Sequence, residues 1–69
     1  MVSKNVIKEK IETNKQYLNS LYAKLTMVSK TAKTRADKRV LVDLVKINED
    51  IEFTKGYIKA LEDIMKELI

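Results

Sequence analysis

Apolar residues recur along this chain in two series, each with alternating spacings of four and three residues. This spacing places every member of a series on one stripe of an α-helix, at the a and d positions of a heptad, as in helices that pack along other helices. The stripes comprise Ile7, Ile11, Asn14, Leu18, Leu21, Leu25 and Val28, and then Val40, Leu44, Ile47, Ile51, Thr54, Ile58, Leu61, Met65 and Leu68. The pattern predicts an all-α fold, an antiparallel two-helix hairpin of the coiled-coil type.

The predicted hairpin is a single domain. We expect the domain over residues 1–69, the first helix over about 4–29, a basic turn over about 30–34 and the second helix over about 35–68. Ser3 or Asn5 is suited to cap the first helix, because either side chain accepts a hydrogen bond from a free backbone N–H. The segment from Thr34 to Asp37 fits a capping box with Thr34 as the N-cap of the second helix.

Folding the chain back at Thr34 makes the two stripes mirror images of each other. The mirror places Asn14, the polar member of the first stripe, against Thr54, the polar member of the second. A slip by one heptad would leave a buried hydrogen-bonding group unmet, at about 1–3 kcal/mol. We therefore predict that the Asn14 and Thr54 layer sets the register.

Charged residues beside the stripes support the same register. It brings Lys24 near Asp43 and Lys8 near Glu62, both attractive, whereas Lys15 falls near Lys55. Exposed ion pairs contribute only a few tenths of a kcal/mol, so they support the register without determining it.

A second group of apolar residues lies outside the stripes. It comprises Phe53, Tyr57, Ala60 and Ile64 along the second helix, Leu41 and Val45 near the turn, and Tyr17 and Tyr22 on the first helix. A lone hairpin leaves these side chains in water, so we expect a homodimer that forms a four-helix bundle, or docking onto a larger partner. The alternative is that these apolar side chains are scattered singly over the protein surface and have no partner. Gly56, at an outward position, costs about 1 kcal/mol relative to alanine and marks a bend or a point of close contact.

Composition limits how such a chain is stabilised. Its 69 residues are near the size at which one core barely offsets the entropy of ordering the chain. The absence of cysteine and histidine excludes a disulfide framework and the usual zinc and haem sites, so oligomerisation is the remaining source of stability. With 35% charged residues, one glycine and no proline, the chain is typical of long helices and not of disorder.

Positive charge is concentrated at the predicted turn. Residues 24–39 contain six Lys or Arg against Asp37 alone, which makes +5, so the other residues sum to −1 of the net +4. Such a tip attracts phosphate backbones, acidic protein surfaces and anionic membranes, although a solvated turn explains it equally well. The candidate contacts to an anionic partner are Lys30, Lys33, Arg35, Lys38 and Arg39.

Catalytic chemistry has few suitable residues in this chain. Nucleophilic and general-base roles would fall to carboxylates, lysines, tyrosines or serines, and the acidic clusters at 49–52 and 62–63 lie at solvated helix positions. We therefore predict no enzyme, no catalytic or metal-binding residues, no cofactor and no small-molecule substrate. The tyrosines can stack on bases, but packing at the bundle edge is the simpler role.

No apolar run approaches the roughly twenty residues that span a bilayer, and charges interrupt the first twenty positions. We expect a cytoplasmic protein with no membrane span and no signal peptide. Its richness in Lys, Ile and Asn fits an AT-rich bacterial or phage genome.

These observations favour a small non-enzymatic regulatory or adaptor protein that acts by protein–protein interaction. An inhibitor of a host protein, encoded by a phage or mobile element, would fit this size. The alternative is a helical-hairpin dimer that binds RNA or DNA through the basic turn. A second alternative is a structural or scaffolding component for which the rod itself is the function.

Overall fold

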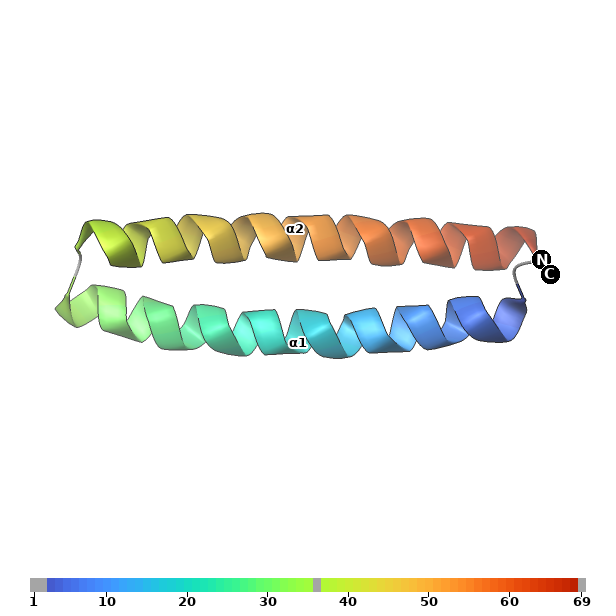
Figure 1. The fold of residues 1–69 in the computed structure, drawn as a ribbon, viewed down its shortest axis with the longest axis horizontal. Helices are drawn as coiled ribbons and strands as arrows, with labels where there is room; N and C mark the ends of the chain where they lie inside the picture. The colour runs from blue at the N-terminus through green and yellow to red at the C-terminus, as the bar shows by residue number, and fades with distance from the viewer. Residues whose placement is uncertain (1–2, 36, 69) are drawn as a thin grey trace.

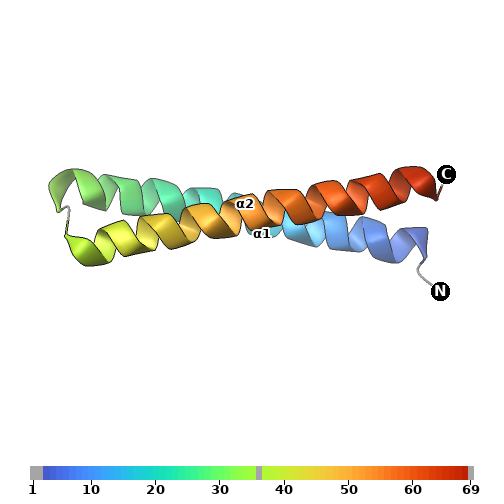
Figure 2. The same ribbon diagram turned by 90° about the horizontal axis from the view of Figure 1, so that it is seen from above.

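The computed structural model describes residues 3–35 and 37–68, so Ala36, which we predicted in the second helix, lies outside the described residues. Two helices follow one another, α1 (Lys4–Thr34) and α2 (Lys38–Glu67), with no strand among the described residues. They lie side by side and antiparallel (Figure 1), and they cross at a shallow angle near their middle (Figure 2). The rod measures 50 × 16 × 14 Å. The predicted all-α two-helix hairpin is confirmed.

Helix α1 begins where the sequence predicts. Ser3 has extended backbone angles, φ −86° and ψ 153°, and its hydroxyl accepts a hydrogen bond from the Val6 N–H at 3.2 Å. A helix start leaves its first N–H groups without intrahelical partners, and this bond satisfies one of them. Ser3 is therefore the N-cap, and Asn5 lies inside the helix.

The turn comes later than predicted. Helix α1 continues to Thr34, and Asp37, not Thr34, caps α2 by accepting a hydrogen bond from the Val40 N–H at 3.0 Å. The Thr34 hydroxyl instead donates to the Thr31 carbonyl at 3.1 Å. The predicted bounds at 29 and 35 are wrong because residues 30–34 contain no glycine or proline to end a helix, and aspartate is a stronger N-cap than threonine.

The core is a single seam between the helices. Leu21, Ile47 and Ile51 form its central cluster, against which Leu18, Leu25 and Val28 pack. The buried residues among those described are Ile7 and Leu21 of α1 and Val40, Ile47, Ile51, Thr54, Ile58 and Leu61 of α2. All of them belong to the predicted stripes, so the heptad pattern correctly identifies the buried face.

The helix ends define which residues lie opposite one another. Since both helices rise about 1.5 Å per residue, residues equally far from Thr34 and Lys38 face each other. Leu25 lies nine residues before Thr34, and Ile47 lies nine residues after Lys38, so these two residues face each other. The mirror at Thr34 instead predicts a partner for Leu25 that lies one helical turn away from Ile47. The packing of Val28 on the central cluster agrees with this register. In the mirror register Val28 would lie about 10 Å along the axis from Ile47.

The two polar residues of the stripes bond within their own helices. Asn14 Nδ2 donates to the Lys10 carbonyl at 2.7 Å, and Thr54 Oγ1 donates to the Asp50 carbonyl at 2.7 Å. Thr54 is buried, and no buried side-chain N or O atom of the described residues lacks a partner. Both donors are therefore satisfied within their own helices.

One ion pair joins the helices in the described part of the chain, between Lys15 Nζ and Glu62 Oε2 at 4.0 Å. Lys55, the neighbour with which we expected Lys15 to clash, pairs instead with Glu52 of its own helix at 3.3 Å. Both pairs are largely exposed and contribute little to stability. The long lysine side chains thus avoid the predicted repulsion.

Candidate interaction surfaces

The structure gathers the predicted cationic residues at the turn end of the rod. Lys30 and Lys33 belong to the end of α1, Arg35 to the turn, and Lys38 and Arg39 to the first turn of α2. All five side chains are exposed. A hairpin necessarily brings the end of one helix beside the start of the next, so this charge forms one surface, which we call the basic tip.

Arg35 is the member of the basic tip with an acidic partner. Its Nε lies 3.0 Å from Oδ2 of Asp37, whose other carboxylate oxygen caps α2. The Asp37 carboxylate therefore both caps α2 and pairs with the Arg35 guanidinium. Lys38 and Arg39 remain in the first turn of α2, where the helix dipole disfavours positive charge and the neighbouring carboxylate, Asp37, is already paired with Arg35. Four cations are thus available to an anionic partner.

Helix α2 carries exposed apolar residues on the side directed away from α1, where they alternate with Glu49, Glu52 and Asp63. Val45 and Phe53 lie on it, exposed by 58% and 76%, and Ala60 continues it toward the carboxyl end. Val42, exposed by 57%, belongs to the same face although the sequence analysis missed it. Its position three residues before Val45 is the signal that identifies it, because residues three apart share a helix face. We call these four residues, with Gly56, the outer face of α2.

The other predicted face residues are exposed as well, and those of α2 border this surface: Tyr57 lies one turn after Phe53, Ile64 one turn after Ala60, and Leu41 one turn before Val45. Tyr17, Tyr57 and Ile64 occupy g positions, and Tyr22 and Leu41 occupy e positions. In an antiparallel pair the e and g positions flank the seam on opposite sides. The six predicted residues of α2 therefore adjoin one another along the exposed side of that helix, whereas Tyr17 and Tyr22 flank the seam on α1.

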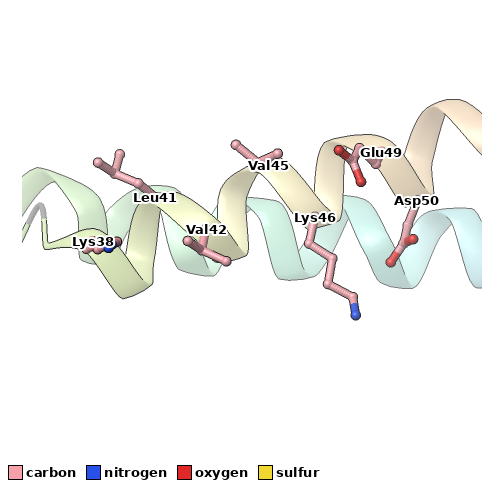
Figure 3. Close-up of a pocket in the computed structure, with 7 residues that line it drawn as sticks. All are labelled: Lys38, Leu41, Val42, Val45, Lys46, Glu49 and Asp50. Atoms are coloured by element: carbon pink, nitrogen blue, oxygen red, sulfur yellow. The ribbon is translucent and has the colours of Figure 1, made fainter.

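A shallow hollow lies on α2 near the turn (Figure 3). Its lining residues all come from α2 and combine apolar side chains with two cations and two carboxylates: Lys38, Leu41, Val42, Val45, Lys46, Glu49 and Asp50. In Figure 3 these side chains spread over the surface of α2, with α1 behind it. Because it is lined by one helix alone, this hollow is open to solvent and not an enclosed cavity.

Among residues 3–35 and 37–68, no three His, Cys, Asp or Glu side chains converge to hold a metal ion. Within the same ranges, neither helix has an apolar stretch sufficient to cross a bilayer. The candidate interaction surfaces of the described residues are the basic tip and the outer face of α2.

No protein-family model matches the chain, and neither a curated protein nor a solved structure shows significant similarity to it.

Proposed function

We propose that this protein is a small non-enzymatic regulatory or adaptor protein that acts by binding another protein, and that it works as a homodimeric four-helix bundle. The observation that carries the proposal is the outer face of α2, where Val42, Val45 and Phe53 are all more than half exposed. Full burial of one such side chain is worth about 1.5–3 kcal/mol. A surface of this kind favours association.

The accessible surface of the rod supports the same proposal. The chain exposes 5676 Å², whereas a compact monomer of its mass, 8.0 kDa, exposes about 4,500 Å². The excess arises because each helix buries only one stripe against the other. Packing two hairpins side by side would remove an area of this size from water.

The molecular mass in solution tests the dimer. Sedimentation equilibrium at micromolar concentration should give about 16 kDa, twice the chain mass of 8.0 kDa. A mass of one chain throughout the concentration series would refute the bundle and would make the outer face of α2 a site for a different protein.

We propose the basic tip as the contact to the regulated protein, which would then present an acidic surface. Replacing Lys30, Lys33 and Arg39 by glutamine removes three charges while keeping residues of similar helix propensity. The matched control replaces Lys4, Lys8 and Lys10 at the other end of α1. Cross-linking in the producing cells, followed by mass spectrometry, should show a partner that the tip variant loses and the control keeps. Equal recovery by both variants would remove the tip from consideration.

A second candidate function is nucleic-acid binding, favoured by the same four cations at one end of the rod. Neutralising about four phosphates predicts an affinity loss of roughly two decades between 50 and 200 mM salt. Titration of a fluorescent RNA hairpin and a DNA duplex measures this slope. Absence of binding at low salt would exclude this candidate and leave the protein-binding proposal intact.

A further inference from the structure

We infer that two copies of this chain form a four-helix bundle by pairing one flank of the seam with the same flank of the second copy, about a two-fold axis that runs along the rod. The inference rests on the dimer proposed above and specifies its interface, its orientation and the residues that meet. A four-helix bundle requires each hairpin to present both of its helices to the other. The interface is therefore a side of the rod that α1 and α2 form together, and its occupant is a second copy of the chain.

One flank of the rod is apolar in the half away from the turn. This flank consists of the g and c positions of both helices, which lie on the same side of an antiparallel pair. In that half its charged residues are Lys10 and Glu67, one near the middle of the half and one at the end of α2. Its apolar residues, all of them exposed, are Val6, Tyr17, Phe53, Tyr57, Ala60 and Ile64. We call this side the tyrosine flank.

The opposite flank, at the e and b positions, is charged in the same half of the rod. It carries no apolar residue there among those described. It carries five lysines instead: Lys8, Lys15, Lys55, Lys59 and Lys66. Pairing this flank with itself would bring Lys15 of one copy near Lys55 of the other. Charge and apolar surface together therefore select the tyrosine flank.

A two-fold axis along the rod leaves every residue at its own height. Helix α1 of one copy then faces α2 of the other, so each residue meets in the second copy the same residue that it meets across its own seam. Tyr17 and Tyr57 differ in height by two residues, about 3 Å. The tyrosines of both copies therefore form one aromatic layer, in which the rings are buried and the hydroxyls reach toward water.

The neighbouring layers set large side chains against small ones. Phe53, exposed by 76%, differs by one residue in height from Ser20, so its ring packs on a serine of the second copy. Alternation of this kind allows helices to interdigitate. The aliphatic part of Lys10 covers Ile64 of the second copy at the open end of the rod, where the ammonium group reaches water.

The half of the flank nearer the turn is charged, and its charges are complementary across the pair. Lys24 and Asp50 occupy g positions and differ in height by two residues, so each Lys24 faces Asp50 of the other copy. Arg39 and Lys46 lie one turn from Asp43 on either side, and Lys46 lies one turn before Asp50. Each carboxylate of this region therefore has a cation beside it.

An axis across the rod would give a poorer match. It would place the turns at opposite ends, so that α2 faces α2 over its full length. Asp43 would then face Ile64 of the second copy, and Asp50 would face Tyr57. Burying a carboxylate against an apolar side chain without a cation is costly. The axis along the rod avoids this cost.

The same axis places both basic tips at one end of the bundle. Lys30 occupies an f position, and Lys33 and Lys38 occupy b positions, so these three cations point away from the paired flank. Their separation limits the repulsion between the tips, because charges more than about 8–10 Å apart are largely screened in salt. An acidic partner would thus meet the cations of two chains at once.

The available area is adequate. The flank measures 50 Å by 16 Å, about 800 Å², and both helices contribute to it along their whole length. A standard stable interface buries about 800 Å² per partner. The apolar half of the flank, about 400 Å², is within the range of the single large patches that mark interaction sites on proteins.

Tyr17→Lys tests the interface, and Tyr22→Lys is its matched control. Both are tyrosines of α1, exposed by 50% and 43%, but Tyr22 lies on the opposite flank. Sedimentation equilibrium should show the dimer dissociation constant raised at least about 30-fold by Tyr17→Lys, as for an aromatic hot spot, and unchanged within about threefold by Tyr22→Lys. Circular dichroism should show the same helicity for both, because lysine is a good helix former.

Cysteine cross-linking tests the orientation, because the chain contains no cysteine of its own. Thr31→Cys of one copy faces Asp43→Cys of the other, so oxidation of a mixture of the two single variants should give a disulfide-linked dimer. Thr31→Cys alone should give none, since the two α1 helices lie diagonally across the bundle, about 13 Å apart. An axis across the rod would separate Thr31 from Asp43 of the second copy by about 30 Å. A dimer of wild-type mass in which the mixture forms no disulfide would overturn the orientation.

The outcomes separate this inference from the proposed function. A wild-type chain that sediments as a monomer refutes the dimer and the inference together. A wild-type dimer that Tyr17→Lys leaves intact refutes the tyrosine flank alone, and loss of the dimer in Tyr22→Lys would place the interface on the opposite flank.

Discussion

The two helices differ in how many apolar faces they carry. Helix α1 has one, the stripe in the seam, and its exposed apolar residues include Tyr17 and Tyr22, whose hydroxyls tolerate water. Helix α2 has two, because it contributes most of the buried residues and also exposes the outer face around Phe53. The hairpin therefore buries one face of each helix and leaves exposed the outer face of α2 as well as Val6 and Met27 of α1. The outer face of α2 gathers three of these side chains, Val42, Val45 and Phe53, each more than half exposed.

The largest expected effect comes from comparing the two faces of α2 directly. Ile51→Ala removes a side chain that is 4% exposed in the central cluster, and should lower the free energy of unfolding by about 2–5 kcal/mol. Val42→Ala on the outer face should cost less than about 0.5 kcal/mol at protein concentrations where the chain is monomeric. Urea unfolding followed by circular dichroism at a low and a high protein concentration measures both. Equal losses at the low concentration would contradict the two-face description of α2.

A second test concerns the polar residues of the seam. Replacing Asn14 and Thr54 together by leucine should raise the free energy of unfolding by about 1–2 kcal/mol, because both positions gain apolar burial. It should also permit alternative pairings or oligomers, which would be visible as a changed mass by sedimentation. An unchanged mass and topology would show that these residues do not set the register. The single variants separate the contribution of buried Thr54 from that of partly buried Asn14.

The turn provides the next largest effect. Asp37→Ala removes the N-cap of α2 and the partner of Arg35, and should cost about 1 kcal/mol of unfolding free energy. Asp43→Ala removes an exposed carboxylate from the same helix and is the control for charge. If Thr34→Ala proves more destabilising than Asp37→Ala in thermal unfolding, the observed helix start is refuted.

The smallest effect concerns the ion pair across the seam. Glu62→Gln breaks the pair with Lys15, whose atoms are 4.0 Å apart and about half exposed, and should change the unfolding free energy by less than about 0.5 kcal/mol. Adding salt should reduce even this difference. A double-mutant cycle with Lys15→Gln gives the coupling directly, and a coupling above about 1 kcal/mol would show that the pair helps to determine the register.

Much of the fold follows from local rules that the sequence displays. Burial in a helical pair follows the heptad, so Leu21, Ile47 and Ile51 were identifiable as core residues from their spacing alone. Ser3 was identifiable as one of two candidate caps, with Asn5, because both carry a short polar side chain that accepts a hydrogen bond from a free backbone N–H, and the structure selects Ser3. The composition of residues 24–39 likewise determined that a cationic end would exist.

The tertiary structure decided where the turn lies, and with it which residues face each other. Residues 30–34 contain no residue that ends a helix, so the end of α1 depends on which cap and which packing are better. Ala32, partly buried opposite the buried Val40, shows what the longer helix gains. The structure also decided that Lys15 reaches Glu62. Spacing along a chain determines direction around a helix, whereas register and neighbours depend on where the chain reverses.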